Sequence, residues 1–168
     1  MQRRALLLAA SPFVLTACAV SEVQTFPTVA SALKAIEGLA SGWRATGTWT
    51  LAQMLEHAAQ SVEFSMHGFP EMKSGLFRAT VGKAAFAVFD TRGQMSHGLA
   101  EAIPGAPPIA AGAALEAAIQ RALKSLRDFE AHSGALAPHF AYGALDKAHF
   151  TRAHLMHLAN HWAEVVRA

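Results

Sequence analysis

Three histidines near the C-terminus have a spacing that can do chemistry: His154, His157 and His161. On an α-helix, residues three, four or seven positions apart share one face, so the three imidazoles would form one stripe. Two histidines four residues apart on a helix can hold one metal ion between them. The same stripe can also be a polar core of hydrogen-bonded imidazoles. The spacing alone leaves both interpretations open.

A metal site needs a further ligand, and the chain offers His57 on a separate predicted helix. Thr50 and Gln53 have the pattern of a capping box at the start of that helix. His57 falls at the edge of the helix's apolar face. Three protein ligands would leave one coordination position open, as in catalytic rather than structural sites. A zinc-protease site is excluded, because no glutamate follows His157 in the segment His157-Leu-Ala-Asn-His161.

Other histidines have less informative positions. His154 is either a ligand or a group that supports a ligand, and the sequence does not decide between the two roles. His139 lies in the loop before the last helix, where it could approach the site and assist proton transfer. His97 and His149 are expected to be solvated.

The predicted secondary structure is helical. Apolar residues at helical spacing predict long helices over residues 28–40, 50–66, 113–132 and from 146 to nearly the last residue. Residues 77–89 suit a helix or a strand, and helix is favoured because alanine and lysine outnumber β-branched neighbours. The expected fold is therefore all-α, a four-helix bundle of up-down topology. An extra short helical segment and a long connector would separate the second and third long helices.

The composition fits one helical domain. The chain has 168 residues, of which 52% are hydrophobic, and this is enough apolar material for a core. The formal net charge is only +2, and the chain has no block of like charge. Nucleic acid is therefore excluded as an expected partner. A small-molecule substrate, a membrane surface and a second copy of the chain in a homodimer remain the expected partners.

The N-terminus has the features of a bacterial export signal. Arg3 and Arg4 precede an apolar run over residues 5–14, and Leu15-Thr-Ala-Cys18 matches a lipobox. The expected organisation is a signal peptide at 1–17, lipidation of Cys18, a tether at 18–27 and the bundle at 28–168. The protein would then be anchored on the periplasmic side of a membrane in the cell envelope. An ordinary cleaved signal with an incidental cysteine is the alternative, and the arginine pair permits Sec or twin-arginine export.

Several blocks of sequence, in order along the chain, resemble those of a known family. They cover residues 49–70, 103–105, 139–145 and 157–161. They are similar to the family of domain of unknown function 1569, within the DinB/YfiT-like superfamily of helical bundles. The resemblance implies a four-helix bundle that holds a divalent metal, often zinc or nickel, through His57, His157 and His161.

The resemblance also bears on activity. Some superfamily members transfer small thiols to electrophiles or hydrolyse small substrates. This chain departs from the family pattern at Asn160, where members often have histidine, and at Trp162, where they have an aliphatic residue. Both positions lie near the mouth of the expected site, so the substrate cannot be carried over. Export would also separate the protein from cytosolic thiol cofactors.

Three functional hypotheses follow. The leading one is an exported, lipid-anchored bundle that binds a divalent metal through three histidines and acts as a transferase or hydrolase on an unknown substrate. The alternative is a non-catalytic envelope module that binds a small ligand or a partner in an apolar pocket. The third is a purely structural bundle without a pocket beside the histidines.

Overall fold

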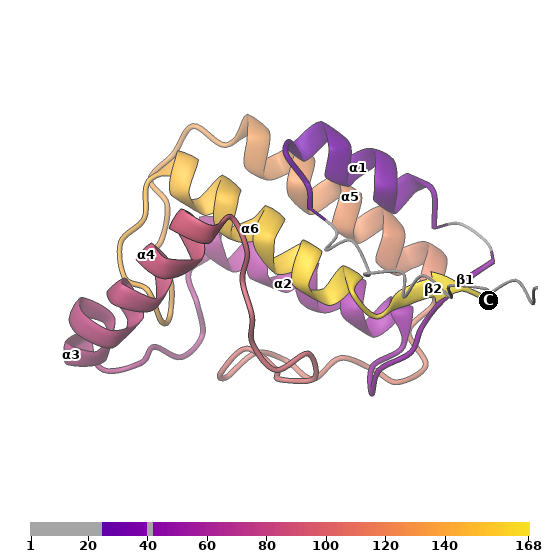
Figure 1. Cartoon of the computed structure of the whole chain (residues 1–168), viewed down its shortest axis with the longest axis horizontal. Coiled ribbons are helices and arrows are strands. Elements are labelled where there is room, and N and C mark those ends of the chain that lie inside the picture. The colour runs from indigo at the N-terminus through magenta and orange to yellow at the C-terminus, as the bar shows by residue number, and fades with distance from the viewer. Residues whose placement is uncertain (1–24, 40–41) are drawn as a thin grey trace, which may run out of the picture.

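The computed structural model describes residues 25–39 and 42–168, which are mostly helical (Figure 1). The helices are α1 (Val29–Glu37), α2 (Leu51–His67), α3 (Gly75–Phe77), α4 (Lys83–Arg92), α5 (Leu115–Ala131) and α6 (Lys147–Trp162), with a π-helical turn, η1 (Arg78–Gly82), between α3 and α4. Two short strands, β1 (Trp43–Ala45) and β2 (Val165–Arg167), form an antiparallel pair. The predicted signal peptide and Cys18 lie outside the described residues, and so does most of the tether. No helix of the described residues is long and apolar enough to cross a bilayer.

Side-chain caps fix where the helices that carry the site begin. The Thr50 hydroxyl accepts a hydrogen bond from the Gln53 amide at 3.2 Å, and the Gln53 side chain accepts one from the Thr50 amide at 3.0 Å. This is the predicted capping box of α2. Asp146 caps α6 as predicted, because its carboxylate accepts a hydrogen bond from the His149 amide at 2.8 Å. Such caps typically stabilise a helix by about 1 kcal/mol, so they set the start of both helices.

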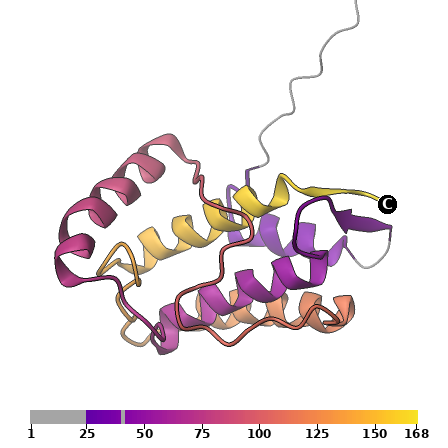
Figure 2. The same ribbon diagram turned by 90° about the horizontal axis from the view of Figure 1, so that it is seen from below.

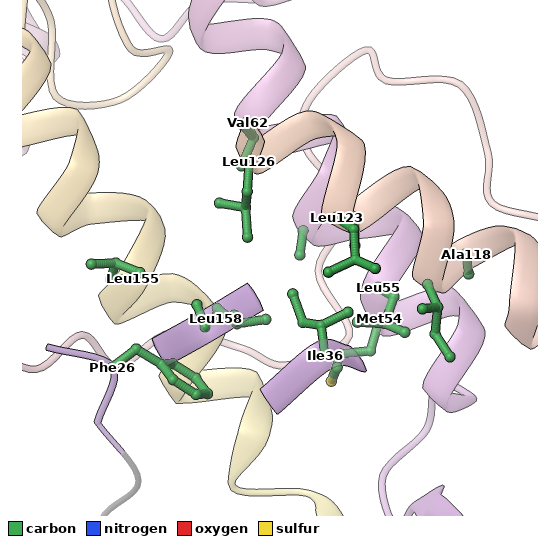
Figure 3. Close-up of a cluster of buried hydrophobic side chains, with 14 of the residues drawn as sticks. Phe26, Ile36, Met54, Leu55, Val62, Ala118, Leu123, Leu126, Leu155 and Leu158 are labelled. Atoms are coloured by element: carbon green, nitrogen blue, oxygen red, sulfur yellow. The ribbon is translucent and has the colours of Figure 1, made fainter. Parts of the chain in front are cut away.

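A single large hydrophobic core holds α1, α2, α5 and α6 together (Figure 3). Ile36 from α1, Leu55 from α2 and Leu158 from α6 meet in this cluster, where each is at most 3% exposed. α5 contributes Leu123 and Leu126 from the other side. α2 packs against α6. The second predicted helix therefore lies beside the last one, as a site shared by His57, His157 and His161 requires.

The segment over residues 77–89 is helical, as favoured, rather than extended. It belongs to the run from α3 through α4, which lies at one end of the molecule (Figure 2). α4 packs on α6 through a second, smaller cluster of buried residues formed by Phe86, Met95, Ala153 and Met156. An ion pair between Asp90 and Arg152 also joins these two helices. The connector 93–114 then returns along α2, where the Gln60 side chain donates a hydrogen bond to the Pro107 carbonyl at 3.0 Å.

The prediction for the end of the chain was wrong, because α6 ends at Trp162 and does not continue to the last residues. Val165 to Arg167 instead pairs with Ala45 to Trp43 as β2 with β1. Val165 and Val166 are β-branched and favour a strand once a partner strand is present. The Arg167 guanidinium lies 4.4 Å from the centre of the Trp43 ring, which adds a cation–π contact to the pair. The first helix also ends earlier than predicted, with Gly38 as its C-cap.

Gly82 gives a test of how the α3–α4 segment is held. A Cβ at residue 82 would lie only 1.8 Å from the Ala141 carbonyl oxygen, in the loop before α6. We predict that Gly82→Ala lowers the free energy of unfolding by about 1–3 kcal/mol, because the backbone of one segment must move away. Urea unfolding of the variant measures this change.

Gly75 is the matched control for Gly82. A Cβ at Gly75 would meet no heavy atom within 4 Å, and its backbone is already helical. Gly75→Ala should therefore leave stability unchanged or raise it by about 0.5–1 kcal/mol. Equal unfolding midpoints for the two variants would contradict the close contact between η1 and the loop.

Candidate metal centre

Three histidine side chains from two helices meet at one point. His57 comes from the middle of α2, and His157 and His161 come from successive turns of α6. The Nε2 atom of His157 lies 3.0 Å from Nε2 of His57 and 3.1 Å from Nε2 of His161. The ligating nitrogens of all three lie within 4.8 Å of one another, so this group can hold a metal ion. They are the three residues selected from the sequence.

Two of the three nitrogen–nitrogen separations match what a divalent ion requires, and the third, between His57 and His161, lies within 4.8 Å. An ion that binds imidazole nitrogen at about 2.0–2.1 Å separates its ligand atoms by about 3.3 Å in a tetrahedron and about 3.0 Å in an octahedron. The observed values of 3.0 and 3.1 Å fall in this range. Neutral imidazoles that direct lone pairs at one point repel one another unless protons or a cation lie between them. The donor set therefore fits a metal that imidazole favours, such as zinc or nickel.

The three rings are deprotonated at neutral pH. Burial, followed by the charge of His97, lowers the pKa of His57 to about 4. Burial, followed by the charges of His57 and His97, lowers the pKa of His161 to about 3. The pKa of His157 also lies well below its usual range, with burial as the largest cause. Each ring thus has a free lone pair at pH 7, which is the form that binds metal.

The remaining ring nitrogens of the group are less well satisfied. Nδ1 of His57 and Nδ1 of His161 are buried and have no hydrogen-bond partner among the described residues. Aromatic packing orients these rings instead, because Trp49 stacks on His161 at an interplanar angle of 11° and also contacts His57. The nearby carboxylates do not orient them.

Glu56 and Glu63 lie on α2, the helix that carries His57, but both carboxylates pair with a residue of α5. The Arg121 guanidinium binds the Glu63 carboxylate with two hydrogen bonds, at 2.7 and 2.9 Å. It also pairs with Glu56. These pairs join α2 to α5, so they contribute to the bundle and not to the histidine group.

His154 belongs to the core and lies outside the group of three. The Ser65 hydroxyl donates to the Val62 carbonyl at 2.6 Å, so its oxygen accepts the hydrogen bond from Nε2–H of His154 at 3.1 Å. The ring packs edge-on against Phe129 and stacks on Phe150. His154 is thus a packing residue beside the site, and it also lines the cavity that opens next to the three histidines.

His139 organises the loop before α6. Its Nδ1 accepts hydrogen bonds from the amides of Ala141 and Tyr142 at 3.1 and 3.2 Å, so its proton is on Nε2. The ring stacks on Tyr142 at 4.2 Å between centroids. His139 also lines the cavity, without joining the three histidines.

His97 is a residue that the sequence argument missed. It was expected to be solvated, but its ring lies 4.9 Å from the His157 ring and 5.1 Å from the His161 ring, between centroids. The reason is the connector after α4, which folds over the site and buries Met95 against α6. No helical spacing relates His97 to the other histidines, so the sequence carries no periodic signal for it.

A cavity of about 440 Å³ opens beside the histidine group. His57, His157 and His97 form one part of its wall. Ser61 on α2, Lys73 in the loop after α2, and His139 and His154 also line it. The other lining residues come from the connector, the loop before α6 and α6 itself, and Glu101 is the charged one among them: Met95, Glu101, Ala102, Ile103, Pro104, Phe140, Tyr142 and Ala153. A small molecule in this cavity would therefore lie next to any ion that the histidines hold.

The buried His154 predicts how stability responds to acid. Burial lowers its pKa to about 3, whereas an unfolded histidine has a pKa of about 6.5. The unfolded chain therefore binds more protons below pH 6.5, and stability falls as pH drops from about 6.5 towards 3, by up to about 1.4 kcal/mol per pH unit. We predict that His154→Gln, which keeps an N–H for Ser65, flattens this dependence in urea unfolding of metal-free protein.

A matched histidine removal serves as control for His154→Gln. His67 is exposed at the end of α2, so His67→Gln should keep the slope of the wild-type protein. If the free energy of unfolding falls equally steeply with decreasing pH in His154→Gln and in wild type, the burial of neutral His154 does not contribute to acid sensitivity.

The comparisons with known proteins agree with the resemblance seen in the sequence. Residues 21–168 match the model of a family described as protein of unknown function, DUF1569. No curated protein and no solved structure matches the chain. Because the match covers nearly all of the sequence, including His57, His157 and His161, the chain belongs to the DUF1569 family.

Proposed function

We propose that this protein binds a divalent metal ion through His57, His157 and His161. The observation that carries the proposal is the meeting of three buried imidazole nitrogens at separations of 3.0 and 3.1 Å. Hydrogen bonding alone accounts poorly for this meeting, because Nε2 of a neutral imidazole has either one proton or one lone pair, so Nε2 of His157 can bond to only one of its two nitrogen neighbours. A cation at the common point would use the three Nε2 lone pairs at once. Zinc and nickel suit this donor set.

We also infer that the fold is the DinB/YfiT-like four-helix bundle of up-down topology. Support comes from α1, α2, α5 and α6, which pack around one core and place the candidate site between two of them. Metal sites in bundles are commonly built from side chains on facing helices. The short segment α3–α4 and the connector 93–114 would then be insertions that complete the site at one side.

The site would act on a small molecule. A bound ion with an open position supplies a Lewis acid. The three imidazoles are neutral, so they leave the positive charge of the ion undiminished. His139 carries its proton on Nε2 at the cavity wall and can donate a hydrogen bond, while Phe140 can pack on an apolar part of a substrate. Metal-dependent transfer or hydrolysis is the chemistry that this arrangement supports.

The cavity also favours a second function, in which a ligand is held without turnover. Its wall is mainly apolar, with Ile103, Met95 and Tyr142 among the lining residues. A ligand could bind by burial of its apolar part there, with a polar end towards the histidines. The protein would then be a ligand-binding module of the envelope and not an enzyme.

We propose that the protein is exported and anchored by lipid at Cys18. The support is in the sequence, where Leu15-Thr-Ala-Cys18 follows an apolar run and the cysteine is the only one in the chain. Residues 18–27 would tether the bundle to the membrane on its periplasmic side. Without a second cysteine, the exported domain has no internal disulfide and depends on its core and on metal for stability.

Metal content tests the proposed centre. Protein purified without chelator or affinity tag should contain one divalent ion per chain, and His157→Ala should contain none. Added Zn²⁺ should raise the melting temperature of metal-free wild type, because binding to the folded state at 100 times Kd stabilises it by about 2.7 kcal/mol. His157→Ala should not respond.

His67→Ala is the control for the metal experiment, since it also removes one histidine but from an exposed position. It should bind metal and respond to Zn²⁺ as wild type does. The proposed function is wrong if wild type holds no stoichiometric metal and its melting temperature does not depend on Zn²⁺.

Lipid labelling tests the proposed anchor. In cells grown with labelled palmitate, the wild-type chain should acquire label and fractionate with membranes, whereas Cys18→Ser should do neither. Ser21→Ala, three residues further on, should behave as wild type. Membrane fractionation of Cys18→Ser at the wild-type level would reject lipidation of Cys18 as the anchor.

A further inference from the structure

His97 lies against the three-histidine group in a way that its place in the sequence does not suggest. Its ring centroid is 4.9 Å from that of His157 and 5.1 Å from that of His161. The rings within the group are 4.8 to 5.0 Å apart. The His97 ring therefore lies as close to the two α6 rings as the His57 ring does, although its nitrogens are not in the group of ligand atoms that lie within 4.8 Å of one another.

The hydrogen bonds of His97 leave one lone pair free. Its Nδ1 lies 2.9 Å from the Gly98 carbonyl oxygen. A carbonyl can only accept, so Nδ1 carries the proton and Nε2 carries the lone pair. That Nε2 atom is buried and has no hydrogen-bond partner among the described residues. A buried nitrogen acceptor without a partner is rare in native proteins and indicates a missing partner.

The connector is fixed close to the site on both sides of His97. The Asn160 side chain, next to His161 on α6, donates to the His97 carbonyl at 3.4 Å. Two residues before His97, Met95 is 9% exposed in the cluster between α4 and α6. These contacts fix the backbone around His97 against α6. The position of the imidazole beside the three histidines is therefore set by packing.

We propose that His97 is a fourth protein ligand of the metal centre, bound through Nε2. This inference rests on the proposed function, since it needs an ion at His57, His157 and His161. Its Nδ1–H bond to a carbonyl is the kind of contact that fixes the tautomer of a ligating histidine. The connector that carries His97 also forms a wall of the cavity, through Ile103 among others.

The fourth ligand has a consequence for access to the ion. His97 would occupy the position that three histidines leave open, so the open position of the proposed function would become available when His97 gives way. His97 is carried by a connector, whereas the other three histidines are on the packed helices α2 and α6. The connector thereby couples occupation of the cavity to coordination of the metal.

X-ray absorption spectroscopy at the zinc edge tests the ligand count directly. The probe is Zn²⁺ bound to the full-length chain, without an affinity tag. Wild type should show four imidazole ligands, and His97→Ala should show three together with a water oxygen. Zinc affinity should fall by about 10–100-fold in His97→Ala, whereas His67→Ala should keep both the spectrum and the affinity.

The outcomes separate this inference from the proposed function. Wild-type protein that binds zinc through three imidazoles, with the same count in His97→Ala, overturns the fourth ligand and leaves the three-histidine centre intact. Wild-type protein that binds no zinc overturns both. The wild-type spectrum alone decides the ligand count, so the test holds even where His97→Ala does not fold.

Discussion

The meeting of three imidazole nitrogens across the contact between α2 and α6 is the constraint that the surrounding packing has to satisfy. Burial lowers the pKa of each ring, so at neutral pH each imidazole has one proton and one lone pair and no positive charge. With Nε2 atoms at 3.0 and 3.1 Å, lone pairs that face one another repel unless a proton or a cation lies between them. The surrounding fold holds the rings together, and a metal ion at the common point would turn this repulsion into binding.

The fold holds the rings by packing that is independent of them. α2 begins at a reciprocal capping box and α6 at an aspartate cap, and both helices contribute to one apolar core. Arg121 pairs with carboxylates on the far side of α2 and so fixes that helix to α5. His154 shows how narrowly the site is defined. Although it lies one turn before His157 on the same stripe, it faces Ser65, Phe129 and Phe150 and belongs to the core.

The sequence predicted the features that depend on local periodicity and capping. The mostly helical fold, the capping box at Thr50, the cap at Asp146 and the shared face of His157 and His161 all follow from short-range patterns. The grouping of His57 with these two histidines needed the facing helices of a bundle and the resemblance to the family. The β1–β2 pair and the position of His97 depend on contacts between distant segments. Val165 and Val166 fit a helix as well as a strand until Trp43 and its neighbours supply a partner, and a lone histidine in a connector has no periodicity to reveal its direction.

The way in which the rings are oriented bears on the chemistry of the site. Metal-bound histidines usually donate their second nitrogen to a carboxylate or carbonyl, which raises ligand basicity. In His57 and His161 that nitrogen has no partner among the described residues, and the flat face of Trp49 fixes the ring of His161 instead. Donors of ordinary basicity and no charge leave an ion strongly electrophilic. Such an ion, beside a cavity whose wall includes Lys73 and Glu101, would favour a polar group on any molecule that binds there.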